Sequence, residues 1–159
     1  MNRFGVLSAG AIAMASVIAA GGVATLAADL ASTVDQRRAI MKQQSEDLKA
    51  ISAYVDDKGG DQATAVAKAR DLASLNAKLE GLWPAGTSSK DMPGKTNAKP
   101  EIWTDQTNFK AALAALSAGE KKLIPALEQG DKAAAKAAMG ELGKNGCGAC
   151  HGSFREKMS

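Results

Sequence analysis

The sequence predicts an all-α fold, an antiparallel four-helix bundle, and three observations support this prediction. Beyond about residue 28 the chain is rich in Ala, Leu, Lys and Glu, which favour helices, and β-branched residues form no alternating runs. Apolar residues recur three and four positions apart in several stretches. Two short turns and one longer crossover separate four expected helices, as in a bundle. With 159 residues, the chain can form one domain with a modest core.

Residues 1–27 are expected to be a secretory signal peptide. Arg3 gives the segment a basic start, Phe4 to Leu26 carry no charge, and small residues precede the expected cleavage after Ala27 or Ala28. An uncleaved membrane anchor is the alternative, because the apolar stretch is long enough to cross a bilayer. Two consecutive glycines within the stretch and the small residues at its end favour cleavage.

The exported domain would comprise residues 28–159 and would lie in the periplasm, without a stable membrane anchor. Loss of Arg3 with the signal lowers the formal charge from +3 to +2. So small a charge gives no argument for binding nucleic acid or an acidic membrane. Aromatic residues make up only 4% of the chain, which also disfavours stacking platforms for nucleic acid bases.

The first helix is expected over about residues 30–55. Its inward stripe has apolar residues at seven-residue spacing and one more between them: Val34, Met41, Leu48, Ile51 and Val55. Residues 56–60 form a turn sequence. The second helix is expected from Asp61, which can cap it, to Leu82, with leucines three and four positions apart on its buried face.

A long loop is expected over residues 83–102, which hold three of the four prolines, and such loops in small domains are often functional. The third helix should run from about residue 104 to 128, kinked near its end by Pro125. The fourth should run from 131 to about 157. Four glycines late in this helix each cost roughly 1 kcal/mol against Ala. We expect close contact with a flat, bulky cofactor to compensate for them.

The only two cysteines of the chain lie in residues 147–151, which read Cys-Gly-Ala-Cys-His. This pattern is typical of covalent attachment of a c-type haem. Positions i, i+3 and i+4 share one face of a helix, so Cys147 and Cys150 can each form a thioether with one haem vinyl group. His151 then points its imidazole at the iron from the same side. We therefore predict one covalently bound haem c with its iron.

Three other interpretations of the cysteines are weaker. A structural disulfide suits an oxidising compartment, but it explains neither the following histidine nor the glycines. A structural zinc centre needs four ligands, and nothing nearby completes the set. A thioredoxin-like redox pair expects a βαβ setting, whereas this region is predicted to be helical.

A second axial ligand of the iron cannot be another histidine, because His151 is the only one in the chain. A methionine sulfur is the remaining strong candidate. Met41 is the best placed, since it belongs to the inward stripe of the first helix. Met139 and Met158 share the helix of the histidine, and Met92 lies in the long loop. Ordinary core packing is the alternative role for Met41.

Several basic residues could approach the cofactor or a partner. Arg37 and Arg38, one turn before Met41, could meet the haem propionates, with a solvated surface pair as the alternative. Arg155 lies one turn after His151 and could sit beside the imidazole or a propionate. A solvated face that could also dock an acidic redox partner is expected from Lys132, Lys136, Lys144 and Lys157.

These features together resemble the class II c-type cytochromes, the cytochrome c-prime family. The resemblance covers nearly all of the exported domain, and the late position of the haem motif is informative. It includes the Phe154-Arg155 pair after the motif, the Gln36-Arg37 pair ahead of Met41, and residues 99–103, Lys-Pro-Glu-Ile-Trp, ahead of Phe109.

The resemblance implies a left-handed four-helix bundle in which His151 is the proximal ligand, Arg155 lies beside it and Arg37 lies near a propionate. It also implies two functions. Typical members keep a five-coordinate, high-spin iron, bind nitric oxide or carbon monoxide and are commonly dimers. A low-spin branch has a methionine ligand from the first helix and transfers electrons, and Met41 followed by Lys42 is similar to that branch.

From these observations the sequence favours a periplasmic protein that transfers single electrons through an iron bound by His151 and Met41. The alternative is a five-coordinate protein that binds nitric oxide or carbon monoxide. No acid–base constellation accompanies the motif, so we do not expect an enzyme. Redox proteins are the expected partners, and both a monomer and a homodimer are compatible with the sequence.

Overall fold

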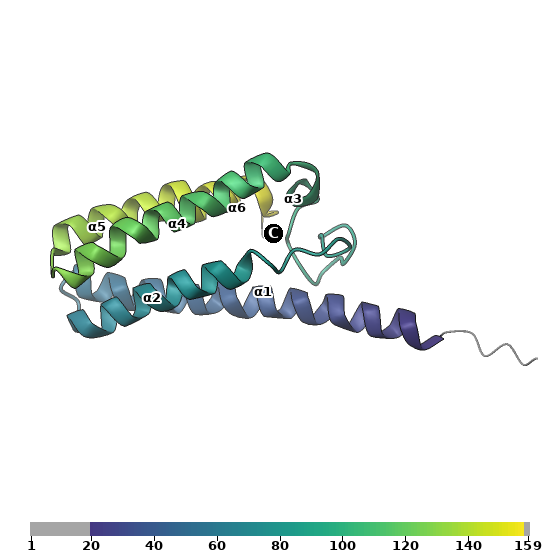
Figure 1. The fold of residues 1–159 in the computed structure, drawn as a ribbon, viewed down its shortest axis with the longest axis horizontal. Coiled ribbons are helices and arrows are strands. Elements are labelled where there is room, and N and C mark those ends of the chain that lie inside the picture. Colours follow the sequence, from purple (N-terminus) through teal and green to yellow (C-terminus); the bar gives the residue numbers. More distant parts are fainter. Residues whose placement is uncertain (1–19, 158–159) are drawn as a thin grey trace, which may run out of the picture.

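The computed structural model describes residues 20–157, which form the predicted all-α bundle. Its four long segments are α1 (Ala20–Val55), α2 (Gln62–Leu79), α4 (Gln106–Glu128) and a composite last segment. This last segment consists of α5 (Lys132–Glu141), a π-helical stretch η1 (Leu142–Gly148) and α6 (Ala149–Phe154). Helix α2 packs against α1 and α4, and α5 packs against α4 and α1, so the four segments close a ring (Figure 1).

Helix α1 begins at Ala20, about ten residues before its expected start, and its first turns extend beyond the other helices (Figure 1). Most of the expected signal peptide, residues 1–19, lies outside the described residues. The inward stripe has the expected register, with Val34, Ile51 and Val55 buried. Within residues 20–157 no helix combines the length and hydrophobicity needed to cross a membrane.

Aspartates cap three of the helices. Asp61 accepts a hydrogen bond from the Thr64 amide at 2.8 Å, and Asp131 accepts one from the Ala134 amide at 2.9 Å. Asp105 caps α4 in the same way at 3.3 Å. Helix α2 ends at Leu79, three residues earlier than expected, because the chain turns there ahead of Pro84.

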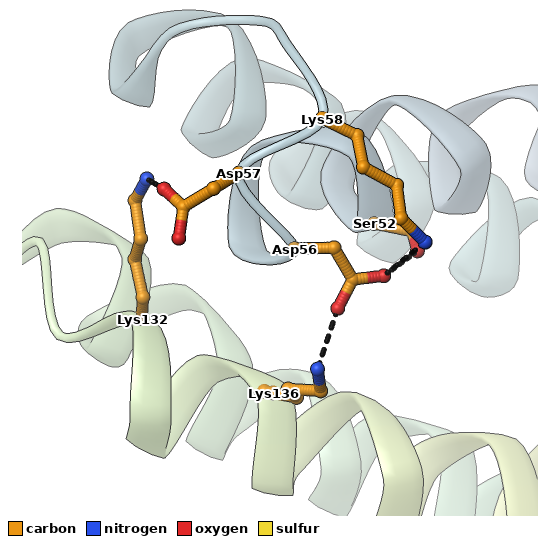
Figure 2. A network of polar contacts seen from close by, with 6 residues as sticks. All are labelled: Ser52, Asp56, Asp57, Lys58, Lys132 and Lys136. Carbon is orange, nitrogen blue, oxygen red and sulfur yellow. Dashed lines mark hydrogen bonds and ion pairs between the residues drawn. The ribbon is translucent and has the colours of Figure 1, made fainter.

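Figure 2 shows how the turn after α1 is tied to α5. Asp56 lies 2.7 Å from the ammonium of Lys136 and 3.4 Å from that of Lys58, and it accepts a hydrogen bond from Ser52. Asp57 pairs with Lys132, whose ammonium also lies 4.4 Å from the Tyr54 ring centroid. Lys132 and Lys136 therefore take part in ion pairs within the chain.

The last helix differs most from its prediction. It was expected to continue to about residue 157, but it widens into η1 and ends at Phe154, where Arg155 is extended. A Cβ atom at Gly148 would lie 2.8 Å from the Gly143 carbonyl oxygen across the widened turn. A glycine at position 148 therefore suits the π-helical geometry.

Helix–helix packing accounts for another of these glycines. A Cβ atom at Gly146 would lie 2.8 Å from Leu116 of α4, and one at Gly119 of α4 would lie 2.7 Å from Leu142. The two helices thus approach closely, each placing a glycine against a leucine of the other. The attribution of all the glycines to a cofactor was wrong, since Gly146 and Gly148 serve the protein's own packing.

The crossover between α2 and α4 includes a short helix, α3 (Glu101–Thr104), and is anchored to the C-terminal end of α6. Ala98 and Arg155 form an isolated bridge. The Lys99 amide donates to the Phe154 carbonyl at 3.0 Å, and the Glu156 amide donates to the Asn97 carbonyl at 2.8 Å. The crossover therefore folds over one end of the bundle, next to the Cys-x-x-Cys-His segment.

Candidate functional site

A cavity of about 900 Å³ lies inside this end of the bundle. Its walls come from α1, α2, α4 and the last segment, and residues 94–98 of the crossover contribute to its rim. Its volume is at the upper end of the roughly 300–1,000 Å³ typical of cofactor and ligand sites. Apolar wall residues include Val34, Leu48, Leu72, Leu79, Leu113 and Leu116. The cavity can therefore enclose a large, mostly apolar group.

The Cys-x-x-Cys-His residues all line this cavity. Cys147 lies in η1, whereas Cys150 and His151 lie in the first turn of α6, and both thiols are free. Burial raises the pKa of the Cys147 thiol, and burial followed by the proximity of Cys147 raises that of Cys150 to about 11. Two protonated, unpaired thiols on one cavity wall could form thioethers with haem vinyl groups.

His151 is suited to bind a metal ion as a neutral imidazole. Burial, and then the positive charge of Arg155, lower its pKa below the usual value. The imidazole therefore keeps a free nitrogen lone pair at neutral pH. Arg155 is exposed and lines the cavity, and its effect on His151 places it near the imidazole as expected.

Arg37 and Trp83 both line the cavity, and each carries a buried N–H donor without a partner. Arg37 is only 3% exposed, donates from Nη2 to the Thr87 carbonyl at 2.8 Å, and stacks 4.5 Å from the Trp83 ring centroid. Its Nη1 atom and the Trp83 Nε1 atom are buried without a partner. Burial lowers the pKa of Arg37 to about 10, so the guanidinium remains charged at neutral pH.

A buried N–H donor without an acceptor lowers the stability of the fold, and a buried cationic donor is stabilised by an anion. The carboxylate of a haem propionate supplies such an acceptor, so the residues present fit a haem in this cavity. Arg38, the other arginine proposed for this role, is exposed and lies 3.9 Å from Asp35. Arg38 lines the cavity as well.

Met41 lines the cavity from α1 and is half-buried. Met41 belongs to α1 and His151 to α6, and these two helices lie apart at this end of the bundle (Figure 1). Met139 also lines the cavity, but from the last segment itself. Met92 is not among the lining residues, and Met158 lies outside the described residues. Met41 thus lines the cavity from a different segment than His151, whereas Met139 shares the last segment with it.

Sequence reasoning missed two groups of residues around the cavity. Four aromatic side chains, Trp83, Trp103, Phe109 and Phe154, pack edge to face with ring centroids 5.1–6.4 Å apart. A buried polar chain also links three helices through Gln44, Asn76 and Glu120. Asn76, an amide within the leucine stripe of α2, was the sequence feature that could have revealed this polar chain. Residues 20–157 hold no cluster of three or more His, Cys, Asp or Glu that could bind a metal ion.

A four-helix bundle that carries Cys-x-x-Cys-His at the end of its last segment, facing a cavity of this size, defines a c-type haem protein. The family model described as Cytochrome C' matches residues 32–155. The chain belongs to the cytochrome c′ family, whose members bind a covalent haem c with its iron.

Relatives and solved structures agree with this family. Cytochrome c′ of Rhodopseudomonas palustris is 33% identical over 144 residues, covering 90% of this chain and 92% of the relative. A cytochrome c′ structure from Rhodobacter spheriodes has a TM-score of 0.72 and 32% identity, covering 81% and 98% of the two chains. A ferrous variant from Alcaligenes xylosoxidans with bound nitric oxide has a TM-score of 0.70 and 27% identity, covering 79% and 94%.

Proposed function

We propose that this protein binds nitric oxide or carbon monoxide at a five-coordinate haem iron. The observation that carries the proposal is the similarity to cytochromes c′ over nearly the whole bundle, including a solved relative with nitric oxide bound. The sequence alone favoured electron transfer through a His/Met-ligated iron, and the comparisons favour its alternative. A cavity lined by His151 and by many apolar side chains suits a small uncharged ligand.

When bound, the haem supplies an iron atom with a coordination position for a diatomic ligand. The side chains of this protein fix its position. Cys147 and Cys150 attach it covalently, and His151 binds the iron as a neutral imidazole. Arg37 and Trp83 donate to a propionate, whose negative charge the guanidinium balances. The leucines and valine of the wall keep water away from the ligand-binding face.

Single-electron transfer is the second candidate function, and the position of Met41 favours it. A thioether from α1 would complete the coordination of the iron. An iron with two protein ligands reorganises little on reduction, and a methionine ligand favours the reduced state. In that case redox proteins are the partners.

Absorption spectra of the ferric and ferrous holoprotein, with and without carbon monoxide at neutral pH, test the two functions. Met41→Leu is the matched variant, because it keeps the volume and removes the sulfur. For a five-coordinate iron we expect high-spin spectra that respond to carbon monoxide, with little difference between Met41→Leu and the parent. A far-red charge-transfer band that disappears in Met41→Leu, together with no response to carbon monoxide in the parent protein, would show that Met41 binds the iron instead.

We also propose that the protein acts in the periplasm after removal of residues 1–27, as a monomer or homodimer and not as an enzyme. The first turns of α1 extend past the other helices (Figure 1), which supports removal of this segment. The mass of protein matured in an exporting cell checks this. We expect a chain that begins at residue 28 or 29 and carries one haem, and a full-length chain would contradict the proposal.

A further inference from the structure

A carboxyl group lies in the core of the bundle without a counter-ion that contributes to its pKa. Glu120 of α4 is 6% exposed, and Asn76 of α2 is 9% exposed. The Asn76 amide donates to Glu120, and the Gln44 amide of α1 donates to Asn76 at 2.6 Å. This polar chain, Gln44–Asn76–Glu120, crosses three helices in a core that is otherwise mostly apolar. Haem attachment does not require it.

The polar chain lies against the cavity. Gln44 and Asn76 both line it, and the negative charge of Glu120 raises the pKa of the Cys147 thiol. Glu120 is therefore close to Cys147, one of the two residues that would hold the haem. Because interactions between charges are strong in a low-dielectric interior, a change in the charge of the haem acts on this carboxyl.

No positively charged group of residues 20–157 contributes to the pKa of Glu120. On its own helix, Lys121 is exposed and Lys122 pairs with Glu141 at the surface. From α1 and α2, the neutral amides of Gln44 and Asn76 face it, and the buried carboxylate of Asp47 pairs with Lys68 at 3.0 Å. From the last segment it is near Cys147, whose thiol no longer titrates once it forms a thioether.

Burial is the larger influence on Glu120 and raises its pKa, while the hydrogen bond from Asn76 lowers it. The carboxyl is therefore held toward its neutral form, and a nearby charge can decide whether it binds a proton.

We propose that Glu120 is a redox-linked proton site, which takes up one proton from solvent when the haem iron gains one electron. A one-electron donor protein reduces Fe(III) to Fe(II), so the buried haem loses one positive charge. The Glu120 carboxylate, no longer stabilised by that charge, binds a proton at its oxygen, and the proton leaves again on reoxidation. Gln44 and Asn76 join the carboxyl to the cavity wall. The proposal goes beyond ligand binding and holds with either axial arrangement of the iron.

The test is the midpoint potential of the holoprotein as a function of pH, for the parent protein and for Glu120→Gln. In the parent protein we expect the potential to fall with rising pH, by up to about 59 mV per tenfold change in proton concentration for a one-electron couple. Glu120→Gln cannot take up the proton and should lose this part of the slope. Glu128→Gln, at an exposed position of the same helix, is the matched control and should keep it.

Infrared difference spectra on reduction give a second readout that needs no variant. We expect the carbonyl band of a protonated carboxyl to appear on reduction of the parent protein. Asn76→Leu removes the hydrogen bond that lowers the pKa of Glu120, so it should move the pH-dependent range upward. Equal pH slopes in the parent protein and Glu120→Gln would overturn the proposal. If Glu120→Gln does not fold, the absence of a carboxyl band from the parent protein at every pH would also overturn it.

Discussion

At the scale of the single residue, Arg37 shows how a buried charge prepares a site for an anion. Its side chain is held by the Thr87 carbonyl and the Trp83 ring, and its Nη1 atom is buried without a partner. A charged donor kept out of water and only partly satisfied is unfavourable until an acceptor arrives. A propionate that accepted a hydrogen bond from this guanidinium would therefore stabilise both the cofactor and the fold.

Replacing Arg37 should weaken the holoprotein. Arg37→Gln removes the charge-assisted hydrogen bonds to Thr87 and to a propionate, and hydrogen bonds to charged groups are worth about 1.5–3 kcal/mol each. We expect the free energy of unfolding, measured with denaturant, to fall by at least about 2 kcal/mol. Arg70→Gln, at an exposed position of α2 that is not among the cavity-lining residues, is the control and should change it by less than about 1 kcal/mol. Equal effects of the two variants would argue against an anion at Arg37.

At the scale of the element, the last segment both carries the haem-attachment residues and packs closely against α4. Its π-helical part carries Cys147, and the following α6 carries Cys150 and His151. Gly146 lets η1 pack directly on Leu116 of α4, and Gly148 fits inside the widened turn. Gly143 lines the cavity and has no protein atom near the position of an added Cβ, so it leaves room for the cofactor.

Two glycine substitutions in this segment should have opposite effects. Gly146→Ala places a methyl group against Leu116 and should lower the free energy of unfolding by about 1–3 kcal/mol through overpacking. Gly140→Ala meets no atom within 4 Å in an ordinary helical turn and should raise it by about 0.5–1 kcal/mol. Denaturant unfolding of both variants checks this. A stabilised Gly146→Ala would mean that α4 and η1 pack less closely than described.

At the scale of the whole molecule, the two ends of the bundle differ in chemistry. One end holds the cavity, the aromatic cluster and the crossover. The other is closed by exposed ion pairs around Asp56 and Asp57 (Figure 2). The pKa of Asp56 is lowered by its hydrogen bonds to Lys136 and Ser52. Its contribution to stability is present above the unfolded pKa and is lost as the pH falls.

Glu120 gives stability the opposite dependence on pH. Its pKa is raised in the folded protein, chiefly by burial, so the folded state favours the protonated carboxyl. This contribution is fully present below the unfolded pKa of about 4.3 and is lost as the pH rises through the folded pKa. We expect the stability of the parent protein relative to Glu120→Gln to fall over that range in chemical unfolding. A constant difference across the range would show that Glu120 does not titrate there.

Local patterns made several features predictable. The seven-residue stripe through Val34 and Val55 and the caps at Asp61 and Asp131 depend on residues close in sequence, so both were predicted correctly. The end of the last helix was not predictable in this way. It depends on two hydrogen bonds with the crossover, more than fifty residues away: the Phe154 carbonyl accepts from the Lys99 amide, and the Glu156 amide donates to the Asn97 carbonyl.

The sequence by itself determined the helical class and the haem-attachment pattern of Cys147, Cys150 and His151, because spacing within one segment is a local property. Only the tertiary structure decided which arginine is buried, why Gly146 is a glycine, and that Glu120, Asn76 and Gln44 meet beside the cavity. These depend on how separate helices approach one another. No local periodicity encodes the distance between side chains that come from different segments of the chain.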